Sequence, residues 1–259
     1  MGIMKELAKN SLKSVGLYPG LQEVRRRIRR SLPRDVRRRG DAARFYSQFI
    51  RDDDLCFDVG ANIGDRTEIF LMLGARVVCV EPQAECLRYL RRRFHKNRRV
   101  LIVDKALGDE EGFSQLYVCD EASTISTMST SWVKESRFSK DFTCWKTQSV
   151  ALTTLDALIR RHGMPTFCKI DVEGYEQTVL RGLTEPIPYV SFEFTREFFD
   201  AATRCANRLS AIGNAKFDFS LGESMRLVLD TWVEPSELFK ALSAIEDDLL
   251  WGDVYAKFE

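Results

Sequence analysis

From residue 51 onward the chain alternates short apolar segments with amphipathic ones, and this alternation constrains the fold more than any other feature. Short apolar runs predict strands at residues 55–60, 76–81, 100–105, 167–172 and 189–194. Apolar residues at helical spacing predict helices at residues 62–74, 83–96, 153–163 and 176–183. We therefore expect an α/β fold whose mostly parallel sheet carries helices on both faces.

Two extended stretches near the C-terminus, residues 215–222 and 248–259, are predicted to complete this sheet, the second as an antiparallel edge strand. Residues 109–153 interrupt the alternation with a stretch rich in Ser and Thr. We expect this insertion to cover the functional site. The predicted catalytic domain spans residues 46–259.

The N-terminal segment has a different composition from the rest of the chain. Its first 50 residues carry 13 Lys and Arg against 4 Asp and Glu, whereas residues 51–259 carry 26 against 34. A short basic amphipathic helix ending near Pro33 is predicted from the apolar residues Leu21, Val24, Ile28 and Leu32. We interpret residues 1–45 as a basic helical arm that contacts its own domain, another subunit of a homo-oligomer, or an anionic surface.

Cysteine usage and hydropathy exclude several classes of protein. The seven cysteines are scattered and include no Cys-x-x-Cys pair, so neither a disulfide framework nor a zinc site is indicated. No apolar run reaches the roughly 18 residues of a membrane span, and the N-terminus lacks the apolar core of a signal peptide. We expect a cytoplasmic protein without a transmembrane segment.

The stretch FDVGANIGD, residues 57–65, predicts a strand that enters a tight turn and then a helix. A dinucleotide site of the G-x-G-x-x-G type requires glycine at positions 60, 62 and 65, but this chain has Asn62 and Asp65 at two of them. Asp65 would also place negative charge beside a pyrophosphate. The turn therefore disfavours a nicotinamide or flavin dinucleotide.

A cationic cofactor without phosphate tolerates such acidic neighbours, and S-adenosylmethionine is one. Asp58 is expected to face its ammonium group. Glu81, at the end of the second strand, lies where a carboxylate accepts hydrogen bonds from both ribose hydroxyls. After the third strand, Asp104 or its neighbour is expected at the adenine amino group. The order and spacing of these residues favour S-adenosylmethionine.

The same residues carry a resemblance to a known family. The segments that carry it are DVGANIGDRTEIFLMLGARVVCVEPQ, ALGD, LDALI and KIDVEGYEQTVLRGL. They resemble the FkbM-type S-adenosylmethionine-dependent methyltransferases over residues 45–195. The resemblance implies a Rossmann-like seven-stranded methyltransferase fold and methylation of hydroxyl oxygens on secondary metabolites and sugars. It also implies a cofactor site at Asp58, Gly60, Asn62, Gly64 and Glu81, with the reacting end of the site at Asp171 and Glu173.

Carboxylates at strand ends are the candidate catalytic groups. Asp171 ends the fourth strand, Glu173 lies in the following turn, and Glu193 lies near the end of the fifth strand, so we expect them to converge on one crevice. A hydroxyl acceptor has to lose its proton during methylation, and a carboxylate is a suitable base. Lys169 shares strand parity with Asp171 and is expected to hold it ionised or to contact the substrate.

Other roles for these acids stay open at this point. Asp171 and Glu173 are also placed to cap the following helix, and Glu193 to pair with a buried arginine. The three carboxylates together can hold a divalent cation, but no fourth ligand is evident, and we assign no metal. The two histidines, His95 and His162, lie in basic helices and are weaker candidates for the base.

The insertion offers further candidate contacts. Its hydroxyls are Ser123, Thr124, Ser126 and Thr127, and its indole rings Trp132 and Trp145 are possible faces for a sugar, unless the segment is an ordinary polar loop. Tyr175 either lines the pocket or begins the next helix.

The sequence therefore predicts an S-adenosylmethionine-dependent methyltransferase that acts on a hydroxyl of a small molecule, sugar or glycan precursor. A nitrogen acceptor is an alternative, because the motifs do not identify the acceptor. A second alternative is an RNA-binding or RNA-modifying protein that uses the basic arm. The N-P-P-[FYW] run common where an exocyclic base nitrogen is methylated does not occur in the sequence.

Overall fold

The computed structural model describes residues 32–119, 122–143 and 145–259 of the chain. The chain divides into two compact units, residues 1–44 and residues 45–259. Apart from Leu32, the helix expected over residues 21–32 lies outside the described residues. Helix α3 (Pro33–Tyr46) begins at Pro33 and was not predicted. Proline suits the first helical position, where its missing N–H has no partner to lose.

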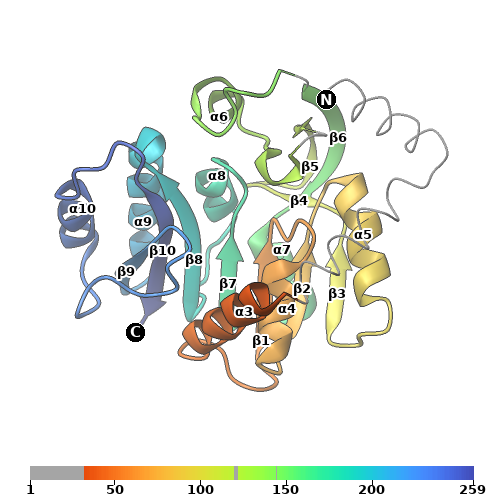
Figure 1. Ribbon diagram of the computed structural model, residues 1–259, viewed down its shortest axis with the longest axis horizontal. Coiled ribbons are helices and arrows are strands. Elements are labelled where there is room, and N and C mark those ends of the chain that lie inside the picture. Colours follow the sequence, from red (N-terminus) through yellow and green to blue (C-terminus); the bar gives the residue numbers. More distant parts are fainter. Residues whose placement is uncertain (1–31, 120–121, 144) are drawn as a thin grey trace. The chain divides into compact units, whose positions relative to one another are not determined.

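The second unit is built on a seven-stranded sheet in the order β3-β2-β1-β7-β8-β10-β9, which runs across Figure 1 from right to left. Its strands are β1 (Leu55–Val59), β2 (Arg76–Val80), β3 (Val100–Val103), β7 (Phe167–Ile170), β8 (Tyr189–Thr195), β9 (Ala215–Leu221) and β10 (Trp251–Phe258). Strands β3, β2, β1, β7 and β8 are parallel neighbours. The predicted mostly parallel α/β fold is confirmed.

One detail of the predicted sheet is wrong. Strand β10 is antiparallel, as expected, but it pairs with β8 on one side and with β9 on the other, so β9 is the edge strand. Residues 252–256 are buried, and a strand between two neighbours satisfies its backbone groups on both sides. The apolar pattern of β10 indicated burial without indicating strand order.

Helices cover both faces of the sheet. The helices of this unit after α3 and outside the insertion are α4 (Asp65–Met72), α5 (Ala84–Phe94), α7 (Leu155–His162), α8 (Glu176–Arg181), α9 (Phe199–Ile212), preceded by the turn η2 (Arg196–Phe198), and α10 (Pro235–Ser243). The four predicted helices are confirmed, whereas α9 and α10 were not predicted. Side chains of α7 to α10 join one sheet face in a single apolar core that contains Phe57, Ile170 and Phe192.

The opposite face of the sheet carries an aromatic layer. Phe70 of α4 packs on Phe167 of β7 with ring centroids 5.6 Å apart, and Tyr46 packs on both rings. Phe49 stacks on Tyr255 of β10 at 5.4 Å. Because side chains alternate along a strand, Phe167 and Lys169 share this face while Cys168 and Ile170 join the main core. Lys169 is thereby buried close to the carboxyl end of β7.

The insertion and the short strand before it form a smaller sheet in the order β4-β6-β5. Its elements are β4 (Ala106–Leu107), β5 (Gly112–Cys119), the turn η1 (Ser123–Ile125), α6 (Thr130–Glu135) and β6 (Trp145–Thr153). No disulfide joins the six cysteines that the structure describes. Among the helices of the described residues, none has the length and apolar character required to cross a membrane.

Candidate active site

The turn after β1 brings backbone from two strands into close contact. Gly60 has φ of +79°, and a Cβ atom built on it would lie 1.8 Å from the carbonyl oxygen of Asp171. Gly64 has φ of +78°, and a Cβ there would lie 2.6 Å from the ring of Phe94 on α5. Gly60 therefore lets the β1 turn approach the loop after β7, and Gly64 lets α5 pack on the start of α4.

Glu81 lies beside this turn with both carboxylate oxygens engaged. Its Oε2 accepts a hydrogen bond from the backbone N–H of Asn62 and its Oε1 accepts one from the N–H of Gln83, both at 2.7 Å. Burial raises the pKa of Glu81 to about 7, although the two hydrogen bonds oppose that shift. Each oxygen keeps a second lone pair, so Glu81 can still accept hydrogen bonds from ligand hydroxyls.

Asp58 lies beneath the turn, within the protein. It is 2% exposed and accepts a hydrogen bond of 2.5 Å from the hydroxyl of Thr67 on α4. Burial raises its pKa, and the Thr67 hydrogen bond opposes the shift. The contact joins β1 to α4, so the position of Asp58 favours a role in organising the turn over direct contact with a ligand.

One cavity connects the β1 turn with the loop after β7. Its empty volume, counted to include the part open to solvent, is about 650 Å³. The residues that line it are Val59, Gly60, Asn62, Val80, Glu81, Pro82, Gln83, Lys105, Ala106, Leu107, Leu116, Ser123, Thr124, Ser126, Thr127, Met128, Asp171, Val172 and Glu173. The predicted site residues Asp58, Gly64, Asp104, Lys169 and Glu193 do not line this cavity.

The acidic residue expected at the adenine end points elsewhere. The side chain of Asp104 is 62% exposed and forms an ion pair of 2.8 Å with Arg91 on α5. Its neighbour Lys105 lines the cavity, together with Ala106 and Leu107. The carboxylate of Asp104 therefore lies outside the cavity, and the ammonium of Lys105, which only donates, cannot accept a hydrogen bond from an adenine amino group.

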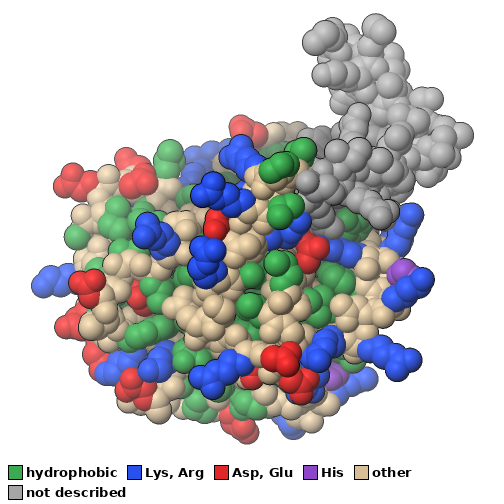
Figure 2. Space-filling view, turned by 60° about the horizontal axis from the view of Figure 1, so that its bottom comes forward, with side chains coloured by type: hydrophobic (Ala, Val, Ile, Leu, Met, Phe, Trp, Pro, Cys, Tyr) green, Lys and Arg blue, Asp and Glu red, His purple; other side chains and the backbone are tan. Residues whose placement is uncertain are grey.

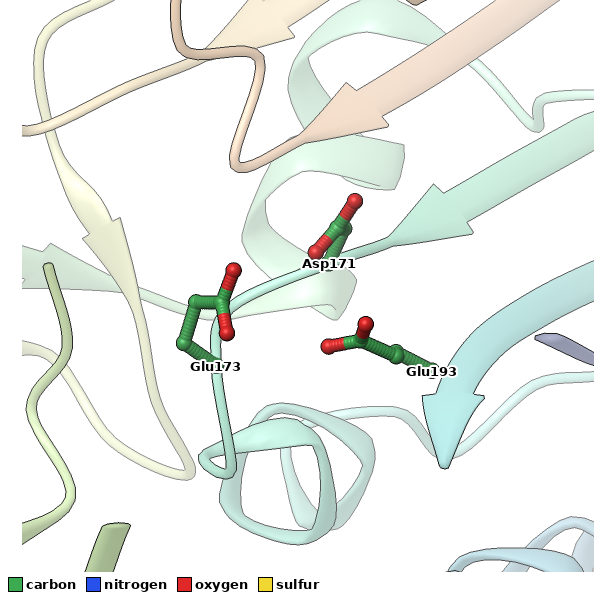
Figure 3. A group of neighbouring side chains, drawn as sticks. All are labelled: Asp171, Glu173 and Glu193. Atoms are coloured by element: carbon green, nitrogen blue, oxygen red, sulfur yellow. The ribbon is translucent and has the colours of Figure 1, made fainter. Parts of the chain in front are cut away.

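Three carboxylates converge beside the cavity, as Figure 3 shows. Asp171, Glu173 and Glu193 each place a carboxylate oxygen within 4.8 Å of the others. Strands β7 and β8 are parallel, and Ile170 pairs with Phe192, so the next residues, Asp171 and Glu193, come level. Glu173 reaches the same point from the loop, where it has φ of +56°.

Electrostatics in this group favour binding of a proton or a cation. Burial raises the pKa of Glu173 and Glu193 well above the usual range, and the neighbouring carboxylates, including Asp171, raise both further. A divalent cation would find three oxygen ligands here. A hydroxyl proton would find a base.

Lys169 forms an ion pair with Asp171, one of the three converging carboxylates. Its side chain is 2% exposed, and its ammonium lies 2.9 Å from Oδ2 of Asp171 and 3.5 Å from Oδ1 of Asp253. Burial lowers the pKa of Lys169, but Asp171 and Asp253 offset this and raise it well above its usual value. Because Lys169 does not line the cavity, its geometry supports orienting Asp171 and not contacting substrate. Asp253 was not predicted, since only strand pairing places it beside Glu193.

The helix-capping interpretation of Asp171 and Glu173 is wrong. Helix α8 begins after Tyr175 without a side-chain cap, and Tyr175 packs on the main core. Instead, the carboxylate of Glu176 accepts hydrogen bonds from the N–H groups of Val172 and Gly174, at 3.0 and 3.2 Å. Burial raises the pKa of Glu176 to about 7. Glu176 therefore shapes the loop, a role that sequence reasoning missed.

The structure also bears on the other roles considered for Glu193, for the two histidines and for the two tryptophans of the insertion. No arginine pairs with Glu193 within the part of the chain that the structure describes. His95 is exposed and His162 half-buried, and both lie outside the cavity lining. Trp132 is 1% exposed and packs on Gly174, so the expectation of a sugar-binding face there is wrong. Trp145 is partly buried and donates to the carbonyl of Phe142.

Comparison with known protein families identifies the family to which the chain belongs. The profile of the Methyltransferase FkbM domain matches residues 58–213, more than half of the sequence. The chain belongs to the FkbM methyltransferase family. The matched residues of this FkbM domain contain the β1 turn, Glu81 and all three converging carboxylates. No curated protein matched the sequence.

Several solved structures are similar to this chain at low identity. A precorrin-6y C5,15-methyltransferase from Geobacter metallireducens GS-15 is 11% identical, with 84% of this chain and 87% of that chain covered and a TM-score of 0.46. A putative rRNA methylase from Clostridium thermocellum is 9% identical, with coverages of 85% and 95% and a TM-score of 0.42. Fibrillarin from Aeropyrum pernix, solved with natively bound S-adenosyl-L-methionine, is 10% identical, with coverages of 80% and 68% and a TM-score of 0.41.

The crowding of carboxylates predicts a stability effect that depends on pH. We expect Glu193→Gln to raise the Tm at pH 8 but not at pH 4, because the pKa of Glu193 is raised on folding. A carboxyl group whose pKa is higher in the folded protein than in the unfolded chain stabilises the fold at low pH. That contribution is lost as the pH rises above about 4.3, the pKa of an unperturbed glutamate. The expected gain in Tm is about 2–4 °C for each kcal/mol by which the substitution relieves the cost of a buried, crowded carboxyl group.

Scanning calorimetry at the two pH values measures this gain. Glu185→Gln is the matched control, because Glu185 is exposed and lies outside the carboxylate group. We expect the control to leave the Tm unchanged at both values. A Glu193→Gln protein that is equally or less stable than wild type at pH 8 would contradict a pKa of Glu193 that is raised by burial and by the neighbouring carboxylates.

Proposed function

We propose that the protein is an S-adenosylmethionine-dependent methyltransferase that methylates a hydroxyl oxygen of a small molecule, sugar or glycan precursor. One observation carries the proposal. The β1 turn and Glu81 line the same cavity as Asp171 and Glu173, so a cofactor on the first pair lies next to acids on the second. Membership of the FkbM methyltransferase family supports methyl transfer as the reaction.

The residues of the cavity fit this cofactor. Gly60 lets the β1 turn approach the loop after β7, and Glu81 offers acceptor lone pairs for two ribose hydroxyls. Apolar side chains that suit a nucleobase come from Leu107, Leu116 and Met128. Bound there, S-adenosylmethionine supplies an electrophilic methyl group. The acidic surroundings suit its positive charge.

Asp171 is the candidate base for the acceptor hydroxyl. Its side chain is 38% exposed and borders the cavity, and its Oδ2 atom bonds to Lys169, which leaves Oδ1 for a ligand. An alcohol is almost fully protonated at neutral pH, because its pKa is close to the 15.7 of bulk water. Asp171 takes the proton while the cavity holds the acceptor oxygen in line with the methyl group.

Calorimetry with S-adenosylhomocysteine tests the cofactor assignment. We expect binding that strengthens as pH rises towards about 7 and then levels off, because ribose hydroxyls donate to ionised Glu81, whose pKa is about 7 in the free protein. Glu81→Gln should weaken binding by about 1–3 kcal/mol, or about 5- to 150-fold, and flatten this pH dependence. Tight binding of NADH without binding of S-adenosylhomocysteine would exclude the proposed function.

The acceptor requires a direct screen. Purified protein is incubated with cofactor labelled in the methyl group and with pools of sugars, polyketides and RNA. We expect label in a hydroxyl-bearing small molecule, at an ether linkage that resists the conditions that release N-methyl groups. Label on nitrogen instead would make the protein an N-methyltransferase.

Label in the RNA pool would favour the alternative that uses the basic arm. Most of that arm lies outside the described residues. On the face drawn in Figure 2, the described Lys and Arg side chains are interspersed with Asp and Glu and form no continuous basic surface.

A further inference from the structure

A short segment of the insertion covers the cofactor cavity. We call residues 122–129 the cover. Five of its side chains line the cavity: Ser123, Thr124, Ser126, Thr127 and Met128. Its backbone is hydrogen-bonded to β5 of the smaller sheet at Tyr117, which exchanges two bonds of 2.8 and 3.0 Å with Thr127, and at Cys119, whose carbonyl accepts from the N–H of Ala122 at 3.2 Å. The hydroxyl of Ser126 also accepts from the N–H of Cys119 at 3.2 Å. Side chains outside the insertion add further bonds to the cover.

Gln83 is bonded to both the cover and the carboxylate of Glu81. It follows β2 and is 6% exposed. Its backbone N–H donates to Glu81 at 2.7 Å, while its side-chain Nε2 donates to the carbonyl of Ser123 at 2.9 Å. Its Oε1 accepts from the hydroxyl of Ser126 at 3.1 Å. The backbone of Gln83 thus contacts the proposed ribose site, and its side chain contacts the cover.

Two further contacts connect the cover to the rest of the site. Asn62, whose N–H donates to Glu81, accepts a longer hydrogen bond of 3.4 Å from the hydroxyl of Ser123. At the other end of the cover, the hydroxyl of Thr127 donates to the carbonyl of Glu173 at 2.7 Å. The cover thus spans from the proposed cofactor contacts to the loop of the converging carboxylates.

We propose that Gln83 is a positioning residue that holds the cover over the bound cofactor and aligns Glu81 with the ribose. The proposal rests on the proposed function. The side chain of Gln83 performs the first task and its backbone N–H the second, so the two tasks are separable by mutation. Buried amides are costly to leave without partners, which explains why both of its side-chain groups are bonded.

The variant Gln83→Ala separates the tasks, because it keeps the N–H bonded to Glu81 and removes both bonds to the cover. We expect S-adenosylhomocysteine to dissociate about 5- to 150-fold faster, the effect of losing two neutral hydrogen bonds. Stopped-flow fluorescence measures the dissociation rate. Hydrogen exchange without ligand measures the cover itself, and we expect faster exchange in residues 122–129.

Gln148→Ala is the matched control. Gln148, on β6, donates to the carbonyl of Pro82 at 2.7 Å and accepts from the N–H of Ala84, so it holds the same turn without a hydrogen bond to the cover. We expect dissociation within twofold of wild type. An equal acceleration in Gln83→Ala and Gln148→Ala would assign the effect to the turn and overturn the proposal.

Unchanged dissociation and unchanged exchange in a folded Gln83→Ala protein would also overturn it. Thermal unfolding checks that both variants fold. If the wild-type protein binds no S-adenosylhomocysteine, the proposed function fails, and the exchange of residues 122–129 alone still decides whether Gln83 holds the cover.

Discussion

Asp171→Asn is expected to lower turnover by about 10²- to 10⁴-fold, the range typical of losing a general base, while cofactor affinity and folding are retained. Asparagine keeps the shape of the side chain but cannot accept the acceptor proton. Lys169 keeps an ion-pair partner in this variant, because Asp253 lies 3.5 Å from its ammonium. Rates are measured with labelled cofactor and the acceptor found by the screen, and affinity with S-adenosylhomocysteine.

Glu173→Gln and Glu193→Gln are the controls, since both acids belong to the same group without an ion pair to Lys169 among the described residues. We expect smaller losses from each. Full turnover in Asp171→Asn with collapse in Glu193→Gln would move the base to β8. Losses of folding stability alone in all three variants would make the acids structural.

Chelation distinguishes two uses of the same carboxylates. If Asp171, Glu173 and Glu193 act without metal, turnover is indifferent to EDTA. If they hold a divalent cation that lowers the pKa of the hydroxyl, EDTA abolishes turnover and Mg²⁺ restores it. The second result would reassign Asp171 from base to ligand.

The sequence predicted those features that depend on local pattern. Strands and the first four helices follow from the spacing of apolar residues, which persists because each element buries one face or both. Convergence of Asp171 with Glu193 followed from a general rule, since the carboxyl ends of parallel strands meet at one edge of the sheet. To predict the positions of these two residues, it was enough to assign the strand that each of them follows or ends.

Features that depend on strand order and long-range packing were not predictable in this way. Asp253 is separated from Lys169 by more than 80 residues, and only the insertion of β10 beside β8 brings it near. Nothing in the sequence distinguishes Gln83 from other residues that follow a strand. Its role depends on its hydrogen bond to the carbonyl of Ser123 in the cover, which only the structure shows. The indole ring of Trp132 is of a kind that can stack on a sugar, and only its packing on Gly174 shows that it belongs to the protein interior.

Gly60→Ala is expected to abolish measurable binding of S-adenosylhomocysteine, with a loss of 10²-fold or more, and to destabilise the fold by about 2 kcal/mol or more. The added Cβ would lie 1.8 Å from the carbonyl oxygen of Asp171 and would sit on a backbone with φ of +79°. Backbone oxygen cannot rotate away as a side chain can. The β1 turn and the loop after β7 would therefore separate, which moves Glu81 and Asp171 apart.

Calorimetry gives the affinity and urea denaturation gives the free energy of unfolding. Gly112→Ala is the matched control, because a Cβ at Gly112, in β5, would meet no atom within 4 Å. We expect that variant to stay within about 0.5 kcal/mol of wild type and to bind normally. If Gly60→Ala were destabilised as expected yet bound S-adenosylhomocysteine with wild-type affinity, the close approach at Gly60 would serve the fold alone, and the cofactor would have to lie away from this turn.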